Sequence, residues 1–211
     1  MILDASCLAV RSSETAAIVA PASRPGKQRS NHLPLPIRQQ LLGPLHTEAQ
    51  PLICGQRLTI KGYVLSAMEV ETLGPFDAAT GIMILHHIEP FSQFALSLGR
   101  SLKPGARAFF YENNASNKLL IWFRDHIVGK FWVPKYGDAD EFPLQPKEID
   151  SLRPYFKVCQ EFPCMVFFQL LSTYILKGRC LGLTRAVDNF LYKRGWLLGY
   201  SYRQYLLLEK L

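Results

Sequence analysis

Charged residues are scarce in this chain of 211 residues: they make up 19% of it, against about 25% in an average soluble protein. The charges present are biased, because 24 Lys and Arg stand against 17 Asp and Glu, which leaves a net charge of +7. Hydrophobic residues reach 48%, which excludes a wholly disordered chain. The basic residues form no single run, so the charge favours a membrane surface or a small anionic substrate and argues against nucleic acid.

Cysteine is also sparse, and no two cysteines have the two-residue spacing of a zinc or redox motif. Their number is five, which is odd and predicts reduced thiols in a cytoplasmic protein. A secretory signal is not recognisable, since Asp4 interrupts the first ten residues. The longest apolar stretch, residues 165–176, is well short of the roughly 20 residues that a spanning helix needs. We therefore expect a cytoplasmic protein, membrane-associated at most by peripheral contact, without a metal site.

Acidic residues are absent from residues 15–46, and six prolines fall between Pro21 and Pro51. Proline removes a backbone donor and fixes φ, so residues 15–46 are expected to be loop or disordered. We interpret residues 1–55 as an irregular N-terminal segment and residues 56–211 as an α/β domain.

Strand and helix signals alternate after this segment. Residues 58–65 are rich in β-formers, and residues 76–85 form a nearly continuous apolar run, typical of a strand covered on both faces. Apolar residues then recur at helical spacing between 91 and 102, behind Pro90. Another apolar strand follows at 106–111. A strand, a helix and a strand of these lengths predict a right-handed βαβ unit with parallel strands.

Short motifs in this region follow a fixed order. Phe76 and Asp77 open the covered strand, residues 84–88 read Ile-Leu-His-His-Ile, and residues 102–105 read Leu-Lys-Pro-Gly. Residues 136–144 read Tyr-Gly-Asp-Ala-Asp-Glu-Phe-Pro-Leu. In these motifs, residues 64–211 resemble the second half of class I S-adenosylmethionine-dependent methyltransferases.

The resemblance implies an α/β fold with a seven-stranded, mostly parallel sheet and helices on both faces, here with an incomplete or irregular N-terminal part. It implies methyl transfer from S-adenosylmethionine to a small or lipid-like acceptor, without a metal. A helical insert at residues 163–200 would form a lid over that acceptor. By the same resemblance, His86 and Glu112 are the candidate catalytic residues, and the cofactor-binding positions are Asp4, Ser66, Ala67, Gly81 and Ile82.

Two interpretations stay open for each candidate catalytic residue. His86 is either a general base, since neutral imidazole accepts a proton near pH 7, or a residue that caps the helix or fills the wall of the cleft. Glu112 either orients the substrate or is a plain carboxylate at a strand end. The aromatic helices of the insert and the basic residues beside them favour an acyl, prenyl or aromatic acceptor, presented at a membrane surface.

The part of the family pattern that holds the cofactor is degenerate. Residues 2–10 are the candidate first strand and loop, but Ser6, Leu8 and Val10 stand where the family has glycines, which let backbone approach the ligand. The stretch without acidic residues leaves no carboxylate for the ribose hydroxyls.

Three hypotheses follow from this loss. The chain is a pseudoenzyme or inactive remnant that acts through an apolar basic surface, a copy interrupted by a foreign stretch at about residues 8–52, or a cofactor binder of divergent type. The acceptor and the oligomeric state stay open.

Overall fold

The computed structural model describes residues 66–130 and 142–211 in full, together with Tyr63 and the backbone of the strands that precede Ser66. Those early strands are β1 (Cys7–Arg11), β2 (Thr15–Pro21), β3 (Thr47–Ala49), β4 (Leu52–Ile53), β5 (Gln56–Arg57) and β6 (Thr59–Leu65). The later strands are β7 (Phe76–Ile82), β8 (Leu102–Asn113), β9 (Phe156–Glu161) and β10 (Arg203–Lys210).

Eight of these strands form one mixed sheet in the order β3-β6-β2-β1-β7-β8-β10-β9, and β4 pairs with β5 apart from it. Strands β2, β6, β7, β8 and β9 run in one direction, whereas β1, β3 and β10 run in the other. Only two neighbouring pairs in this sheet, β2 with β6 and β7 with β8, are parallel. The α/β class is confirmed, but the prediction of a seven-stranded, mostly parallel sheet is wrong in its strand count and its pairing.

The predicted βαβ unit is present as β7, helix α2 (Phe91–Ser101) and β8. α2 begins behind Pro90 and buries Phe91, Phe94 and Leu98 on one face. α2 ends at Ser101 and β8 begins at the next residue, Leu102. Pro104 and Gly105 therefore lie inside the strand and not in a separate turn. They form an irregularity there, because Phe76 pairs with Leu102 and Ala78 pairs with Arg107.

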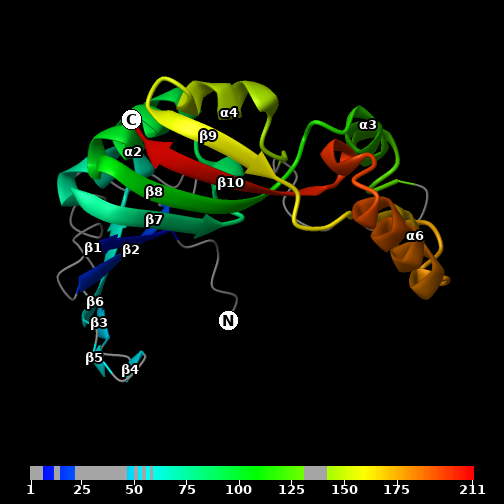
Figure 1. The fold of residues 1–211 in the computed structure, drawn as a ribbon, viewed down its shortest axis with the longest axis horizontal. Coiled ribbons are helices and arrows are strands. Elements are labelled where there is room, and N and C mark those ends of the chain that lie inside the picture. Colours follow the sequence, from blue (N-terminus) through cyan, green and yellow to red (C-terminus); the bar gives the residue numbers. More distant parts are fainter. Residues whose placement is uncertain are drawn as a thin grey trace, which may run out of the picture.

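One face of the sheet carries the hydrophobic core. Helices α2 and α4 (Pro146–Leu152) lie together along this face, and the short 3₁₀ helix η1 (Ala67–Leu73) packs on α2 (Figure 1). Alternate residues of β8 and β10 point into this core, among them Phe110, Leu206 and Leu208. The opposite face carries Phe109, Tyr111 and Tyr205, all partly exposed, and the ring of Tyr205 contacts the other two. In the described residues, helix packing therefore concentrates on one face, in contrast to the prediction of helices on both.

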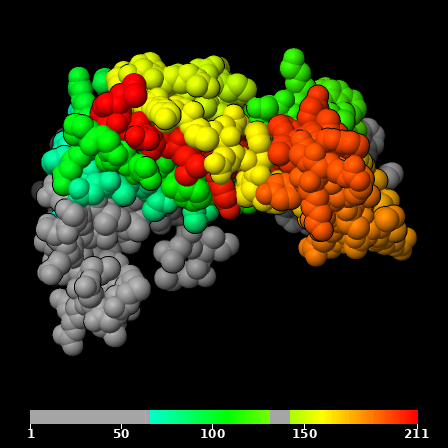
Figure 2. All heavy atoms as spheres, viewed as in Figure 1, coloured from blue at the N-terminus to red at the C-terminus, as the bar shows by residue number. Residues whose placement is uncertain are grey.

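The remaining helices lie at one end of the sheet, beyond the carboxyl ends of β7 and β8 (Figure 1). They are α3 (Lys118–His126), α5 (Phe168–Tyr174), α6 (Leu181–Lys193) and the 3₁₀ turn η3 (Leu198–Tyr200). We call residues 164–201, which hold α5, α6 and η3, the helical unit; in the space-filling view it forms the orange lobe beside α3 (Figure 2). Within the residues described, no helix combines the length and the apolar character needed to cross a bilayer.

The expectation of loop or disorder from residue 15 is wrong for residues 15–21, which form β2 and pair in parallel with β6. Residues 22–46 lie outside the described part of the chain, as do residues 136–141 of the Tyr-Gly-Asp motif. The division of the chain at residues 55 and 56 stays a prediction.

Candidate functional site

The carboxyl ends of β7 and β8 lie side by side, because the two strands are parallel neighbours. Open α/β sheets bind their ligands at this edge, which we call the carboxyl edge. Glu112, the next-to-last residue of β8, is fully buried there. Its Oε1 accepts hydrogen bonds from the backbone N–H groups of Ile84 and Leu85, both at 2.7 Å. Glu112 therefore holds the turn that follows β7, unlike a plain carboxylate in a loop.

His86 binds the other oxygen of the same carboxylate. Its Nδ1 lies 2.7 Å from Glu112 Oε2, and its side chain is only 4% exposed. Because an ionised carboxylate only accepts hydrogen bonds, Nδ1 donates to it, and in the neutral tautomer with this proton Nε2 keeps its lone pair. The pair therefore fixes the ring and leaves one nitrogen able to accept a proton. Within the described residues, no three His, Cys, Asp or Glu side chains gather as a metal site would require.

The 3₁₀ turn η2 (Leu85–His87) begins at this pair. Its leading amides are bound by Glu112, so His86 is not the residue that caps it. The ring of His87 lies 4.1 Å from that of His86, centre to centre. The interpretation of His86 as a general base stays a prediction, now with a defined partner.

Arg203 reaches the carboxyl edge from β10. Its Nη1 donates to Asn113 Oδ1 at 2.6 Å and lies 3.1 Å from the sulfur of Met83. The guanidinium carbon stands 5.5 Å from the ring centre of Tyr111 and 5.6 Å from that of Tyr202. Burial raises the pKa of the Tyr111 hydroxyl, and the positive charge of Arg203 partly offsets this effect. Sequence analysis did not identify Arg203, because no local motif marks it.

Two buried asparagines tie the carboxyl edge to the helical unit. Asn114 and Asn117 follow β8, and both are fully buried. Their side-chain amides donate to three backbone carbonyls of the helical unit, those of Gly199, Tyr200 and Ser201. Asn117 Oδ1 also caps the first turn of α3. The position of α3 and the helical unit at this edge is therefore set by buried polar contacts, which are costly to leave unmade.

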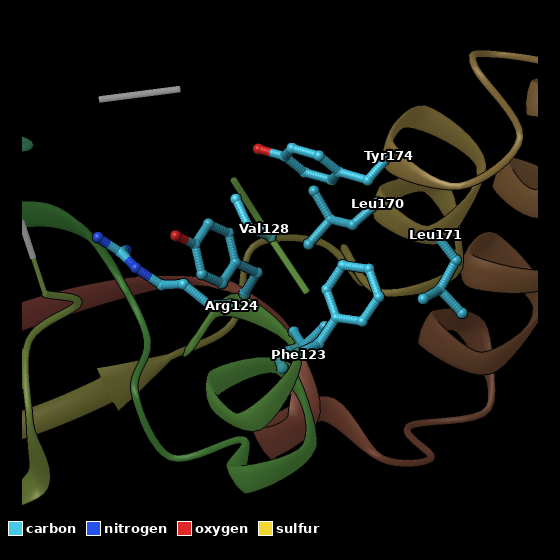
Figure 3. Close-up of a pocket in the computed structure, with 8 residues that line it drawn as sticks. Phe123, Arg124, Val128, Leu170, Leu171 and Tyr174 are labelled. Carbon is cyan, nitrogen blue, oxygen red and sulfur yellow. The ribbon is translucent and has the colours of Figure 1, made fainter. Parts of the chain in front are cut away.

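A pocket opens between α3 and α5 (Figure 3), with a cavity of about 70 Å³. Its lining is mostly apolar and consists of Leu120, Phe123, Arg124, Val128, Leu170, Leu171, Tyr174 and Tyr202. In the close-up, the side chains of Phe123 and Leu170 face each other, while Arg124 extends to one side. The guanidinium of Arg124 lies 5.5 Å from the ring centre of Phe142. Since Tyr202 lines the pocket and also contacts Arg203, this α3–α5 pocket adjoins the carboxyl edge.

The predicted cofactor-binding residues are engaged in local structure. Ser66 caps η1, which begins at Ala67, and its Oγ accepts a hydrogen bond from the backbone of Met68. A Cβ added at Gly81 would lie 2.7 Å from the Ile84 side chain, so this glycine serves tight internal packing. Ile82 is 59% exposed. Asp4 lies outside the described residues.

Ser66 follows β6 and Gly81 is the next-to-last residue of β7, and both strands end at the carboxyl edge. β2 and β1 stand between those strands in the sheet, so the two residues are separated by roughly 14 Å at the usual strand spacing. In the described residues, every buried side-chain nitrogen or oxygen has a hydrogen-bond partner, so none of them is left for a ligand to satisfy.

The strand order at the centre of the sheet is that of a doubly wound fold. β6, β2, β1, β7 and β8 stand in the positions of the third, second, first, fourth and fifth strands, and such folds bind nucleotides where the first strand meets the fourth. There the first strand is parallel to the fourth and leads through a Gly-rich loop into a helix.

Here β1 runs antiparallel to β7, so Arg11, the last residue of β1, lies at the edge opposite the carboxyl edge. β1 and β2 are antiparallel and separated by residues 12–14 alone, whereas a parallel crossover takes a dozen or more. β1 is therefore not the parallel strand expected from the resemblance. The described residues do not build the cradle that S-adenosylmethionine requires.

No protein-family model matches this chain, and no curated protein matches it in sequence. The chain is similar in structure to a SAM-dependent methyltransferase from Archaeoglobus fulgidus (15% identity, TM-score 0.42), to the [4+2]-cyclase SpnF (14%, 0.40) and to phosphoethanolamine N-methyltransferase 2 of Haemonchus contortus (12%, 0.39). The last of these structures contains S-adenosylhomocysteine.

The matches cover 70%, 72% and 72% of this chain. They cover 67%, 56% and 37% of the three proteins, respectively, so the chain spans only about a third to two thirds of their length. Solved structures similar to this chain thus include SAM-dependent methyltransferases. At these TM-scores, the likeness carries no conclusion about the chemistry of the chain.

Proposed function

We propose that this chain is a non-catalytic relative of the methyltransferases, which binds a small, lipid-like molecule in the α3–α5 pocket without transferring a methyl group to it. The proposal depends on the resemblance in residues 64–211 and on one observation about the other half of the sheet. A hairpin of β1 and β2 occupies the place where the fold needs a parallel strand, a Gly-rich loop and a helix.

The chemistry of the α3–α5 pocket indicates the kind of ligand. Its apolar walls favour an acyl or aromatic group, and Arg124 supplies a positive charge at one side. Within the described residues, no carboxylate forms an ion pair with Arg124. A cavity of about 70 Å³ accommodates only the end of an apolar chain, because sites that enclose a whole ligand hold roughly 300 Å³ or more. We therefore propose an apolar carboxylate as the ligand class.

Calorimetric titration of the full chain with S-adenosylhomocysteine tests the absence of a cofactor site. We expect no heat of binding up to millimolar ligand. Binding in the micromolar range would overturn the proposal, because it would show that a cradle forms despite the hairpin.

Titration with octanoate, and with octanol as its uncharged control, tests the α3–α5 pocket. Leu170→Trp should abolish octanoate binding by filling the pocket, and Arg124→Gln should weaken it about tenfold by removing a charge-assisted contact. Leu183→Trp is the matched control, since Leu183 is 67% exposed on α6. Failure of octanoate and octanol to bind would contradict the pocket assignment, as would equal loss of binding in the control.

Methyl transfer to a small or lipid-like acceptor is the second candidate, and the pair of His86 and Glu112 favours it. The pair lies at the carboxyl edge, where Glu112 orients the ring and Nε2 can take a proton from an acceptor hydroxyl or amine. The same titration with S-adenosylhomocysteine separates the candidates. If it binds at this edge, Ile82→Glu should weaken binding, whereas Leu211→Glu, at an equally exposed position outside the edge, should not.

A further inference from the structure

The helical unit exposes an unusual share of the large hydrophobic side chains. Of the fourteen that are exposed in the described residues, nine belong to this unit: Ile175, Leu176, Leu183, Val187, Phe190, Tyr192, Trp196, Leu197 and Tyr200. Single exposed apolar residues are normal on a protein surface, but a concentration of them marks a site of interaction.

The orientation of α6 explains why these side chains face outward. Leu183, Val187 and Phe190 recur at helical spacing and are 67%, 36% and 51% exposed. The inward face carries Leu181, Thr184, Asp188 and Leu191, of which only Asp188 is almost fully buried. An ordinary surface helix turns its apolar residues to the core, whereas α6 also carries three of them on its outer face.

Asp188 holds α6 in this orientation. Its carboxylate accepts hydrogen bonds from the backbone N–H groups of Phe167, Phe168 and Gln169, at 3.3, 3.0 and 3.0 Å. Those amides open α5, whose N-terminus therefore depends on a side chain of α6. Turning the apolar face of α6 inward would break three hydrogen bonds and expose the first amides of α5. The outward apolar face is thus built into the unit.

The charge around this face has one sign. The helical unit contains five basic residues, all exposed: Lys177, Arg179, Arg185, Lys193 and Arg194. Its only acidic residue is Asp188, whose oxygens are bound to the amides of α5. Arg194 lies over the rings of Phe190 and Trp196, at 5.2 and 5.8 Å from their centres. A basic rim beside aromatic side chains fits a surface that is apolar inside and anionic outside.

We propose that the outer face of α6, with Trp196 and Arg194 beside it, docks on an anionic lipid membrane. Leu183, Val187 and Phe190 enter the boundary between headgroups and acyl chains, and the basic residues bind the lipid phosphates and carboxylates. A second copy of this chain fits the face poorly, because it would bring the five positive charges of each unit together. This inference does not depend on methyl transfer or on the α3–α5 pocket.

Flotation of the full chain with lipid vesicles tests the proposal. We expect binding to vesicles of phosphatidylcholine with 30% phosphatidylserine, at low protein concentration, and much weaker binding to phosphatidylcholine alone. Lys193→Gln with Arg194→Gln should weaken binding about thirtyfold, since each basic residue near the surface contributes about 1 kcal/mol. Phe190→Ser should weaken it at least tenfold.

Matched controls keep the test specific. Lys147→Gln with Arg153→Gln removes two exposed charges outside the unit, and Leu211→Ser removes an exposed apolar side chain there; neither should change flotation. Absence of binding to both vesicle types would overturn the proposal, as would equal binding to both. Light scattering of the free protein over a range of concentrations completes the test. A dimer that Phe190→Ser dissociates would assign the face to a second copy instead.

Discussion

The sheet with its helices and the helical unit use their apolar residues in opposite ways. In the sheet region, Phe110, Leu206 and Leu208 join one core with the inner faces of α2 and α4. The helical unit contributes Met165 alone to the buried hydrophobic side chains of the described residues, and nine of its large apolar side chains are exposed. One region thus uses apolar surface to fold, and the other keeps it available for contact with another surface.

The two regions resemble each other in one respect. Each is organised around a buried carboxylate that binds backbone amides at the start of a helical turn, Glu112 at η2 and Asp188 at α5. Ionised carboxylates accept such hydrogen bonds strongly. In the sheet region this contact lies beside a complete hydrophobic core, whereas in the helical unit it is a main internal contact.

The largest expected difference between the regions is the effect of removing a phenyl ring. Phe110→Ala should lower the free energy of unfolding by about 3–5 kcal/mol, because Phe110 is fully buried and would leave a cavity. Phe190→Ala, at a position 51% exposed, should change it by about 0.5 kcal/mol or less. Urea unfolding of both variants measures the comparison. Similar losses in the two would mean that Phe190 is part of a core.

Adding one methyl group should change the stability of the fold in opposite directions in the two regions. Gly81→Ala should destabilise the fold by about 1–3 kcal/mol, because the new Cβ would lie 2.7 Å from Ile84 and 2.9 Å from Phe110. Gly182→Ala lies in α6 with nothing within 4 Å and should stabilise it by about 0.5–1 kcal/mol. Thermal unfolding followed by circular dichroism compares them. A stabilised Gly81→Ala variant would contradict the tight packing at the end of β7.

The smallest effect concerns two thiols of the helical unit. Burial raises the pKa of the Cys164 thiol, and the charge of Asp188 adds to this, although Arg203 opposes it. At pH 8, Cys164 should therefore hold less thiolate and react with iodoacetamide a few times more slowly than the exposed Cys180. The difference between the two labelling rates should narrow as the pH rises through the pKa of Cys164. Mass spectrometry of the labelled peptides measures both rates, and faster labelling of Cys164 would refute the comparison.

Local sequence patterns were sufficient for the second half of the fold. The apolar run at residues 76–85 gave β7, and the helical spacing behind Pro90 gave α2. α4 carries the same kind of local signal, because proline stands at its first residue and Glu148 completes a capping box. These signals act within a few residues of one another, so they can be read without knowledge of the tertiary structure.

The centre of the sheet could not be predicted in the same way. The apolar pattern of a strand is the same for parallel and antiparallel pairing, so the pattern of residues 7–11 does not predict the direction of β1 in the sheet. β2 lies at the start of a proline-rich stretch and pairs with β6, some forty residues later in the chain. One signal was available: if residues 7–11 and 15–21 are both strands, three residues between them allow a hairpin but no crossover.

The sequence names candidate residues for the site, but it does not show which of them contact one another. His86 and Glu112 are both candidates from the sequence, but they are 26 positions apart, and only the tertiary structure shows that their side chains are hydrogen-bonded to each other. In the same way, Asp188 reads as an exposed polar position of a surface helix. Its burial follows from the free amides of α5, which no pattern within α6 reveals.

The pairing of β9 with β10 has a consequence for the architecture of the whole chain. These strands are antiparallel neighbours, and their register begins with Glu161 opposite Tyr205. The residues between the end of β9 at Glu161 and the start of β10 at Arg203 are, in topological terms, an enlarged hairpin loop. Its length can change, or a short turn can replace it, without moving any strand of the sheet. The helical unit is therefore a modular insertion, and the contacts that would have to be remade on its removal include those of Asn114 and Asn117.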